Sequence, residues 1–443
     1  MSTHQIAHLA PFLTLLLVTA GTLQAQDRRT QVFNDREKFL DSQHWIYNDL
    51  EAGIREAKRQ DRPLLVVFRC IPCEACHEFD EQVAERDPIV RSVMAQYVCV
   101  RIPMANAMDL TQFQFDFDQS FAAFLMHHDG TLLGRFGTRS GRDNEQEDIS
   151  LDGLRKALEA GLAFYAQYDK VKPSLAGKQV KQTRYERPQD YPSLAGRYQD
   201  TLDYEGQVVQ SCLHCHQIGE AQRLVFRNQR QAIPADVLYP YPHPKVLGLT
   251  MDPAEMATVS EVAEGSVANK AGIQTGDRIA SLEGQPVLSI ADVQWVLHHA
   301  PSSGELQASI ERGGERRDIS LQLAAGWRKG DISWRSTTWD LRKMALGGLS
   351  LEDLPSERRG ELGLDDDKLA LHVWHLGMYN DHAAALRAGF RKGDILVGFD
   401  GRGDRMTESQ LIEHSINNHF AGERVPVTVL RDGNKIDLVL PIQ

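Results

Sequence analysis

The stretch Cys70-Ile71-Pro72-Cys73-Glu74-Ala75-Cys76-His77 places three cysteines within seven residues. The apolar run Leu64–Phe68 precedes it and a helix-like stretch follows, so the cysteines occupy a strand-to-helix loop. A thiolate at the N-terminus of a helix is stabilised by unpaired backbone N–H groups and by the helix dipole, which makes it a usable nucleophile near neutral pH. The stretch therefore predicts a redox-active loop.

This strand–loop–helix arrangement resembles the thioredoxin fold. Proteins of that fold usually place the attacking cysteine five residues after the last aromatic residue of the strand, and counting from Phe68 leads to Cys73. The resemblance implies that Cys73 is the nucleophile, that Cys76 is the resolving thiol and that Cys70 is an addition to the loop. Thioredoxins also carry a cis-proline before the penultimate strand, where this chain has Phe121. The alternative that the loop cysteines form only a local disulfide stays open.

The residues around the loop predict an α/β thioredoxin-like domain over residues 30–170. Apolar positions recur at helical spacing before the loop, and they alternate after it as in a strand. The expected elements are a helix over 45–58, a strand over 97–102, a hairpin formed by 124–126 and 132–137, and a closing helix over 151–168.

The N-terminus, residues 1–25, has the character of a secretory signal peptide. Its apolar stretch over residues 9–20 is too short for a membrane span, and small residues follow it up to Ala25. No later segment is apolar enough to cross a bilayer. We therefore expect a protein of the periplasm or cell envelope, with no transmembrane span after signal removal.

Composition excludes some functions. The net charge of −12 comes with interspersed Lys and Arg and no basic stripe, so nucleic acid is not an expected partner. The 443 residues are enough for several domains. Five of the six cysteines lie in two tight clusters, which favours chemistry over a disulfide framework. The sixth, Cys99, lies in a β-patterned run and reads as a buried small apolar residue.

The second cluster, Cys212-Leu213-His214-Cys215-His216, matches the Cys-x-x-Cys-His attachment signature of c-type haem. Cys212 and Cys215 would bind the two vinyl groups of one porphyrin, and His216 would coordinate the iron as its metal ligand. The resemblance to c-type cytochromes implies attachment outside the bacterial cytoplasm, which agrees with export. His243 and Met251 are candidate distal ligands.

Other functions for this cluster stay open. A zinc site could use Cys212, Cys215, His214 and His216, and the two cysteines could instead form a structural disulfide or a dithiol. The cluster lies in a segment, 171–245, that is expected to be a linker between domains. Two short helices, over 202–218 and 220–231, are expected within it.

The C-terminal half contains an internal repeat. Lys270-Ala271-Gly272-Ile273-Gln274-Thr275-Gly276-Asp277 recurs as Arg387-Ala388-Gly389-Phe390-Arg391-Lys392-Gly393-Asp394. Each copy resembles the core of a PDZ domain, which implies two β-rich α+β domains over 246–326 and 327–443. In the first copy the resemblance implies Leu247-Gly248-Leu249 as the carboxylate-binding loop and Ile290–His298 as the helix flanking the groove.

PDZ domains bind a peptide C-terminus through the N–H groups of that loop, and the peptide adds as a strand to the sheet edge. Peptide C-termini or protein substrates are thus the expected partners. Either copy could instead be a packing or dimerisation module with a blocked groove, above all the second, which carries a long insertion. The many histidines of this half show no metal-ligand spacing and read as scattered surface or core residues.

The order of motifs resembles a family of thioredoxin/PDZ envelope proteins found mainly in planctomycete bacteria, some members of which carry selenocysteine. The resemblance implies an exported thiol–disulfide redox protein whose PDZ domains recruit protein substrates, with haem as an electron relay if it is bound. The competing hypothesis is a non-catalytic envelope scaffold whose cysteine clusters hold structure or a cofactor.

Overall fold

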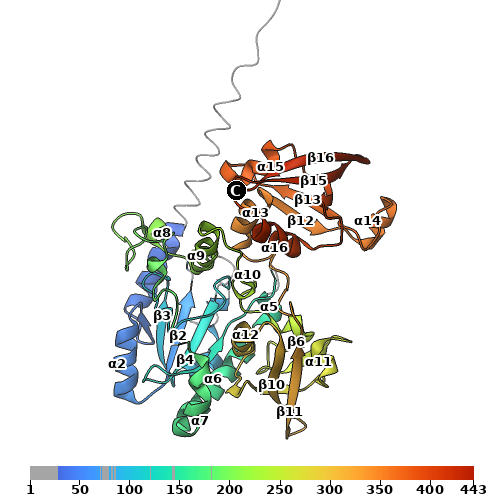
Figure 1. Cartoon of the computed structure of the whole chain (residues 1–443). Helices are drawn as coiled ribbons and strands as arrows, with labels where there is room; N and C mark the ends of the chain where they lie inside the picture. Colours follow the sequence, from blue (N-terminus) through green and yellow to red (C-terminus); the bar gives the residue numbers. More distant parts are fainter. Residues whose placement is uncertain are drawn as a thin grey trace, which may run out of the picture.

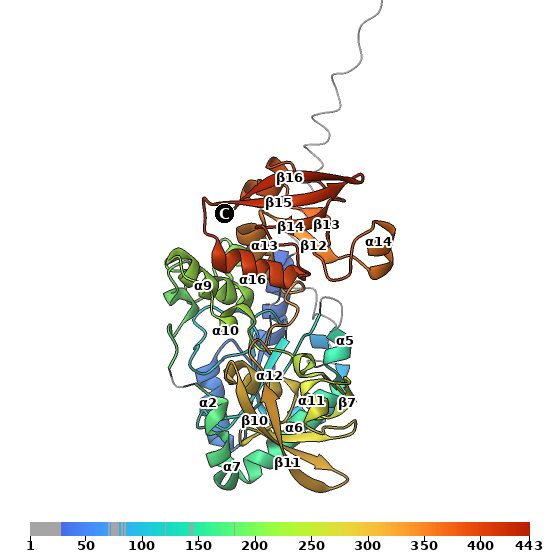
Figure 2. The same ribbon diagram turned by 45° about the vertical axis from the view of Figure 1, so that its right-hand side comes forward.

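The computed structural model describes residues 28–69, 71, 79–80, 83, 86–119, 121–141, 145–180 and 182–443. The thioredoxin-like sheet and the first repeat lie side by side in one body, and the second repeat forms a β-rich body at one end of it (Figure 1). The view in Figure 2 shows the same arrangement. Among the described residues, no helix has the length and apolar character needed to cross a membrane.

A five-stranded mixed sheet forms the first domain, in the order β1-β3-β2-β4-β5. Its strands are β1 (Trp45–Tyr47), β2 (Leu64–Arg69), β3 (Val98–Ile102), β4 (Phe121–Met126) and β5 (Leu132–Phe136). Alternate residues of β2 face two buried clusters, one towards α2 (Leu50–Gln60) and one towards α4 (Pro88–Met94) and α6 (Leu151–Ala166). Because both faces are covered, residues 64–68 are apolar without interruption.

The expected helix over 45–58 is wrong at its start. Residues 45–47 form β1, which pairs in parallel with β3. Helix α2 begins only at Leu50, because the Asp49 side chain accepts a hydrogen bond from the N–H of Ala52 and caps the helix there. The closing helix is also divided, since α6 ends at Ala166 and α7 (Tyr168–Leu175) follows.

Much of segment 171–245 packs on the α2 side of the sheet. Its buried residues join the cluster that holds Val66 and Phe68; they are Tyr191, Leu194, Leu213, Ile218, Ala221 and Val225. Its helices after α7 are α8 (Val208–Ser211), α9 (Cys215–Asn228) and α10 (Ala235–Leu238). The expected helix over 202–218 is wrong, because α9 begins at Cys215 and continues through the expected break at 219.

The first repeat contains a two-stranded sheet, β6 (Leu249–Met251) with β7 (Val259–Val262), and a four-stranded sheet in the order β11-β10-β8-β9. The latter strands are β8 (Arg278–Leu282), β9 (Gln285–Pro286), β10 (Gly304–Arg312) and β11 (Glu315–Leu323). Its helices are α11 (Val267–Lys270) and α12 (Ile290–His299). The helix expected from residue 290 is confirmed.

The second repeat forms one five-stranded sheet in the order β12-β13-β14-β15-β16. The strands are β12 (Leu349–Asp353), β13 (Leu371–Leu376), β14 (Ile395–Phe399), β15 (Arg424–Arg431) and β16 (Asn434–Pro441). The helices are α13 (Thr338–Leu346), α14 (Ser356–Glu361), α15 (Ala384–Arg387) and α16 (Glu408–Asn418).

The internal repeat extends to side-chain contacts. In the first copy Arg312 donates to both carboxylate oxygens of Asp277 at 2.6 Å and to the carbonyl oxygen of Gly272 at 2.8 Å. In the second copy Arg431 makes the same three contacts, with Asp394 and Gly389. Both aspartates are fully buried. The Gly-Asp pair of each repeat is therefore a structural anchor for the sheet.

Candidate functional site

The three loop cysteines, Cys70, Cys73 and Cys76, lie outside the described residues, so their assignment as nucleophile and resolving thiols stays a prediction. Residues near the loop are described on both sides. Arg69 ends β2 and Ile71 follows Cys70, while Asp80 comes shortly after the loop. Phe121, at the position expected for the cis-proline, begins β4 and contacts Phe79 with ring centroids 5.0 Å apart.

A buried ion network lies beside the loop. Arg101 on β3 makes two hydrogen bonds of 2.8 Å to Asp80, and it makes two to Asp35 at 2.6 and 3.1 Å. Arg69 Nε lies 3.3 Å from Asp80, and the Tyr47 hydroxyl donates to Asp35. Burial alone raises the pKa of Asp80, but the two guanidinium groups outweigh burial and hold that pKa below its ordinary value. The network therefore fixes residues on both sides of the loop with ionised groups.

The second cysteine motif lies near Ile71, the one described residue of the stretch from Cys70 to His77. Ile71 is partly buried against a small apolar cluster composed of Val32, Met104, Leu202, Val208 and Cys212. Cys212 and Ile71, which are far apart in the sequence, thus belong to one apolar cluster. Cys212 is 3% exposed, and burial raises the pKa of its thiol to about 12.

Asn106 holds this motif on the thioredoxin-like domain. Its Oδ1 accepts a hydrogen bond from Leu213 N at 2.8 Å, and its Nδ2 donates to the carbonyl oxygens of Ser211 and Gln199 at 2.9 and 2.7 Å. The N–H of Ala105 donates to the Leu213 carbonyl. The sequence gives no sign of this role, because the partners of Asn106 are backbone groups about a hundred residues away.

Cys215 is the first residue of α9 and is half-buried. The side chain of Gln217 accepts a hydrogen bond from His214 N at 2.9 Å, which closes the first turn. The helix N-terminus favours negative charge at Cys215, whereas Cys212 is enclosed by apolar side chains. The two thiols of the motif therefore differ in reactivity.

The two histidines of the motif differ as well. His216 Nδ1 lies 3.1 Å from Glu220 Oε1. Burial lowers the pKa of His216, but the hydrogen bond to Glu220 and its charge raise that pKa above the ordinary value overall. For His214, burial and the neighbouring His216 lower the pKa to about 4, so His214 is neutral at pH 7.

The packing at Cys212 does not fit a porphyrin in this conformation. Haem attached to Cys212 and Cys215 needs space beside both sulfur atoms, and the apolar cluster surrounds the first of them. The candidate distal ligands have other surroundings, since Met251 is buried in the core of the first repeat and His243 Nε2 lies 3.6 Å from Asp148. Haem attachment stays a prediction.

The zinc alternative has no preformed ligand set. Within the described ranges, three His, Cys, Asp or Glu ligand atoms approach within 4.8 Å of one another only at Asp400, His414 and His419. Nε2 of His414 and of His419 lie 2.9 and 3.0 Å from one Asp400 oxygen. Arg402 Nη1 is 3.5 Å from His414 Nδ1, and a cation there opposes a bound metal ion. The sequence indicates scattered histidines, and only folding brings these two to Asp400.

Leu247-Gly248-Leu249, the expected carboxylate-binding loop, ends the 3-10 turn η5 (Pro244–Leu247) and begins β6. Gly248 has a φ of 83°, and a Cβ at this position would lie 2.2 Å from Ser266 Cβ, so glycine is required. Its N–H donates to the Lys245 carbonyl at 3.0 Å. One N–H group expected to bind a terminal carboxylate is therefore used within the loop itself.

Helix α12, expected to flank the peptide groove, is buried from Ile290 to Leu297. It lies against β5 and the adjacent turn η3 (Ala176–Lys178) of the thioredoxin-like domain. Trp295 Nε1 donates to the Gly177 carbonyl at 2.9 Å, and Thr138 Oγ1 donates to Gln294 Oε1 at 2.5 Å. The helix thus serves as a docking surface between two domains.

Asp292 is at the centre of this interface. Lys178 Nζ lies 2.8 Å from Asp292 Oδ1, and the backbone N–H groups of Arg135 and Leu288 donate to the same carboxylate. The Arg135 guanidinium stacks on Trp295 at 3.7 Å from the ring centroid. Burial lowers the pKa of Lys178 and of Arg135, the latter to about 10. The stability of each buried charge in this interface depends on its ion-pair and hydrogen-bond partners.

The equivalent helix of the second repeat, α16, is covered by α13. Side chains of both helices share one buried cluster with β12; its members include Leu341, Met344, Leu351, Leu411 and Ile412. Arg342 on α13 donates to Glu408 on α16, and Ser415 Oγ donates to the Ala345 carbonyl at 2.6 Å. In this conformation both repeats use the helices expected to flank their grooves for packing, and peptide binding by either groove stays a prediction.

Three family models match the chain. A "Thioredoxin-like" model matches residues 45–127, and two "PDZ domain" models match residues 258–306 and 371–442. The chain is thus a thioredoxin-like domain followed by two PDZ domains, and the predicted fold is confirmed.

Curated relatives are similar over part of their length. A Haemophilus influenzae protein named "Probable periplasmic serine protease do/HhoA-like" is 28% identical over 144 residues, which are 32% of this chain and 27% of that protein. "Periplasmic pH-dependent serine endoprotease DegQ" of Escherichia coli is 27% identical over 149 residues, 33% of this chain and 29% of that protein. The chain thus spans less than a third of the length of these two relatives.

Among solved structures, "HtrA-type protease AlgWS227A with decapeptide" is 17% identical with a TM-score of 0.20, over 31% of this chain and 40% of that one. The "Crystal Structure of the HtrA3 PDZ Domain Bound to a Phage-Derived Ligand (FGRWV)" is 28% identical with a TM-score of 0.14, over 16% of this chain and 60% of that one.

Proposed function

We propose that this protein is an exported thiol–disulfide redox protein in which Cys73 and Cys76 work together with Cys212 and Cys215. The observation that carries the proposal is the packing of Ile71, between Cys70 and Cys73 in the sequence, on the apolar cluster of Cys212. Export is supported by the apolar stretch over residues 9–20 and by relatives whose names place them in the periplasm.

The proposed reaction is a chain of thiol–disulfide exchanges. The Cys73 thiolate attacks a substrate disulfide, one substrate sulfur leaves as a thiolate, and the other is joined to Cys73. Cys76 then attacks the Cys73 sulfur, which releases the second substrate thiol and leaves a Cys73–Cys76 disulfide. In all, two electrons and two protons pass from the enzyme dithiol to the substrate.

Cys212 and Cys215 would reduce that disulfide in turn. Cys215, at the helix N-terminus, attacks the Cys73 sulfur, which forms a Cys73–Cys215 mixed disulfide and releases Cys76. Cys212 then attacks the Cys215 sulfur, which forms the Cys212–Cys215 disulfide and releases Cys73. Cys73 and Cys76 thereby regain their protons. A thiol reductant of the envelope would complete the cycle by reducing Cys212–Cys215.

The PDZ domains are proposed to recruit protein substrates through their C-termini. In the described conformation the thioredoxin-like domain covers α12 and helix α13 covers α16. Peptide binding would therefore require the contacts of Asp292, or those of α13, to break. Recruitment and chemistry would thereby be linked in one chain.

A disulfide-trapping experiment tests the proposed exchange. The double variant Cys76→Ser, Cys212→Ser keeps the two attacking cysteines and removes both resolving thiols. Mild oxidation with diamide, which takes up the two electrons of the new disulfide, should link Cys73 to Cys215 within one chain, as detected by peptide mass mapping. The matched control adds Cys99→Ser, which removes a buried thiol and should leave the linkage unchanged. A double variant that forms no 73–215 peptide contradicts the exchange.

A peptide-binding scaffold is the second candidate, and the two PDZ matches favour it. Partner capture distinguishes the two. The Cys76→Ser variant should retain partners as mixed disulfides that withstand denaturant, and Cys73→Ser, Cys76→Ser should not. Equal capture by both variants, lost in denaturant, would support the scaffold.

A further inference from the structure

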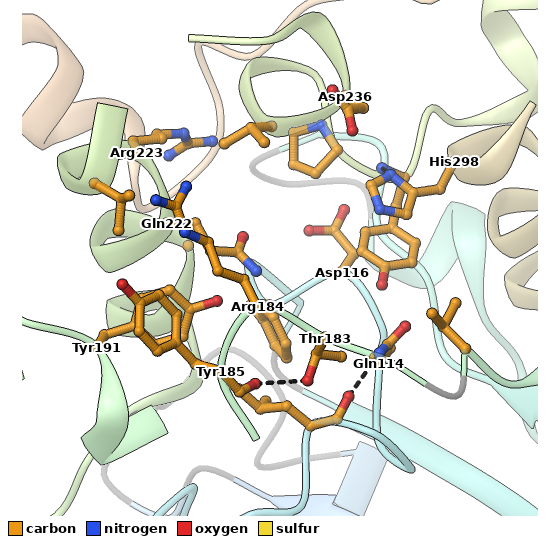
Figure 3. Close-up of a pocket in the computed structure, with 18 of the residues that line it drawn as sticks. Gln114, Asp116, Thr183, Arg184, Tyr185, Tyr191, Gln222, Arg223, Asp236 and His298 are labelled. Atoms are coloured by element: carbon orange, nitrogen blue, oxygen red, sulfur yellow. Dashed lines mark hydrogen bonds between the residues drawn. The ribbon is translucent and has the colours of Figure 1, made fainter. Parts of the chain in front are cut away.

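A cavity of about 380 Å³ lies where the thioredoxin-like domain, Val180, residues 182–185, Tyr191, α9, α10 and the end of α12 meet. We name it the junction cavity. Figure 3 shows Gln222 and Arg223 from α9, Asp116 from the thioredoxin-like domain, and His298 from α12 around one space. Gln182, Arg184 and Asp236 of the lining are exposed, so the junction cavity reaches the surface.

Arg223 lines the junction cavity and is 2% exposed. Its Nε and Nη1 atoms are buried and have no hydrogen-bond partner among the described residues. Burial lowers the pKa of Arg223, and Asp118 opposes this through its charge. Burying two guanidinium nitrogen atoms away from water without hydrogen bonds is energetically unfavourable. Its position in a cavity wall indicates a partner supplied from outside the chain.

The neighbouring carboxylates are engaged by other groups. Arg335 donates to Asp116 Oδ1 at 2.6 Å and to Asp118 Oδ2 at 3.2 Å, and Thr337 donates to both oxygens of Asp118. Asp116 Oδ2 is buried and has no partner among the described residues. Burial raises the pKa of Asp116, while Arg335 and Thr337 hold the pKa of Asp118 below its ordinary value against burial. Arg335 and Thr337 therefore take up both oxygens of Asp118, whereas Nε and Nη1 of Arg223 are left without a hydrogen-bond partner among the described residues.

The remaining walls are largely aromatic and apolar. The rings of Tyr185 and Tyr191 are in contact, with centroids 4.4 Å apart and an interplanar angle of 46°, and Phe226 lies beneath the Arg184 guanidinium at 5.7 Å. A flat apolar group fits against such walls, with its charged end at Arg223.

We propose that the junction cavity binds a small organic monocarboxylate with a flat apolar body, its carboxylate paired with Arg223. A guanidinium group matches a carboxylate by two parallel N–H···O bonds. A dianion such as phosphate is disfavoured because Asp116, Asp118 and Asp236 also line the cavity. No cysteine is among the described residues that line the cavity.

Calorimetric titration of the full chain with phenylacetate and with phenylacetamide tests the proposal. Phenylacetate is too small to add as a strand at a PDZ sheet edge, so PDZ binding does not interfere. Because a charge-assisted hydrogen-bond pair contributes about 1.5–3 kcal/mol, phenylacetate should bind at least about tenfold more tightly than the neutral amide. Equal binding of acid and amide, or binding of neither, would overturn the assignment.

Variants locate the site. Arg223→Met should reduce phenylacetate affinity at least about tenfold. Its melting temperature without probe should equal or exceed that of the parent, because an unpaired buried charge has been removed. The matched control is Arg230→Met, near the end of the same helix and 62% exposed, which should bind normally. If Arg223→Met does not fold, Tyr185→Ala, at a half-buried wall position, should weaken binding severalfold. Unchanged affinity in a folded Arg223→Met or Tyr185→Ala protein contradicts the proposal.

Discussion

At the scale of single residues, the two thiols of the Cys-x-x-Cys-His motif are unlike each other. Cys212 is enclosed by apolar side chains, whereas Cys215 begins a 14-residue helix and is half-buried. Enclosure disfavours the thiolate, and a helix N-terminus favours it. In the proposed exchange this difference makes Cys215 the attacking thiol and Cys212 the resolving thiol.

Alkylation should reveal this difference. At pH 8 with limiting iodoacetamide, Cys215 should be modified at least about tenfold faster than Cys212, because the thiolate is the reacting form. Mass mapping of time points measures both rates, and Cys99, buried to a similar degree, gives the internal standard for a slow thiol. Faster modification of Cys212 would be inconsistent with the enclosure described above.

Stability should fall at alkaline pH. The pKa of Cys212 is raised to about 12 in the folded state, and an unfolded thiol titrates near ~8.5. Between these values the unfolded chain loses a proton that the native state keeps, so the free energy of unfolding decreases with pH by up to about 1.4 kcal/mol per unit for this thiol. Urea titrations at pH 8 and 10 should show a smaller decrease in Cys212→Ala than in the parent. Equal decreases would argue against a buried neutral thiol.

An absorption spectrum tests the prediction of haem attachment. If the Cys212 cluster opens to admit a porphyrin, protein made in a host with cytochrome maturation should carry a Soret band that survives acid-acetone extraction and disappears in Cys212→Ala. His216→Ala should keep the attached haem but change its spectrum. Colourless parent protein from such a host would rule out the attachment.

At the scale of elements, α12 shows how a groove helix becomes an interface. Its sequence, with Asp292, Gln294 and Trp295 among apolar residues, would suit a solvated helix face, yet all three are buried against the thioredoxin-like domain. Lys178 and Arg135 approach from the other side. Opposite charges on two domains are thus buried together.

Removing the Asp292 carboxylate should lower the free energy of unfolding. Asp292→Ala leaves the Lys178 ammonium buried without its partner, and such a loss destabilises by about 3–5 kcal/mol. Urea denaturation measures the change. The double variant Lys178→Met, Asp292→Leu should regain most of the stability, and Asp318→Ala, at an exposed position on β11, should change it by less than about 0.5 kcal/mol. A small effect of Asp292→Ala would mean that the Lys178 side chain reaches water.

At the scale of the whole molecule, Arg335 connects the second PDZ domain to the thioredoxin-like domain. It lies just before α13 and binds Asp116 and Asp118 between β3 and β4, and its Nη2 also donates to the Pro240 carbonyl. Arg227 of α9 adds hydrogen bonds to the carbonyl oxygens of Ile416 and His419 at the end of α16. Arg335 thus joins residues 116–118 and Pro240 to the start of α13, and Arg227 joins α9 to the end of α16.

Removing Arg335 should loosen this junction without affecting the first PDZ domain. In Arg335→Ala two buried carboxylates lose their cation, so amide hydrogen exchange should become faster around residues 116–118 and in α13. Exchange in β10 and β11 should stay unchanged, because that sheet has no contact with Arg335 among its described hydrogen bonds and ion pairs. Uniform acceleration across the chain would indicate global destabilisation instead.

The order of domains could be predicted from the sequence, because each depends on local patterns: the uninterrupted apolar run of β2, the Gly-Asp turns of both repeats, and helical spacing in α6 and α12. The cysteine motifs could also be identified from the sequence. Local patterns, however, do not show which distant residues a side chain contacts. The meeting of Ile71 with Cys212, the role of Asn106, the burial of α12 and the unpaired Arg223 each depend on groups that are distant in sequence. Only tertiary packing decides which polar groups lose water and what then pairs with them.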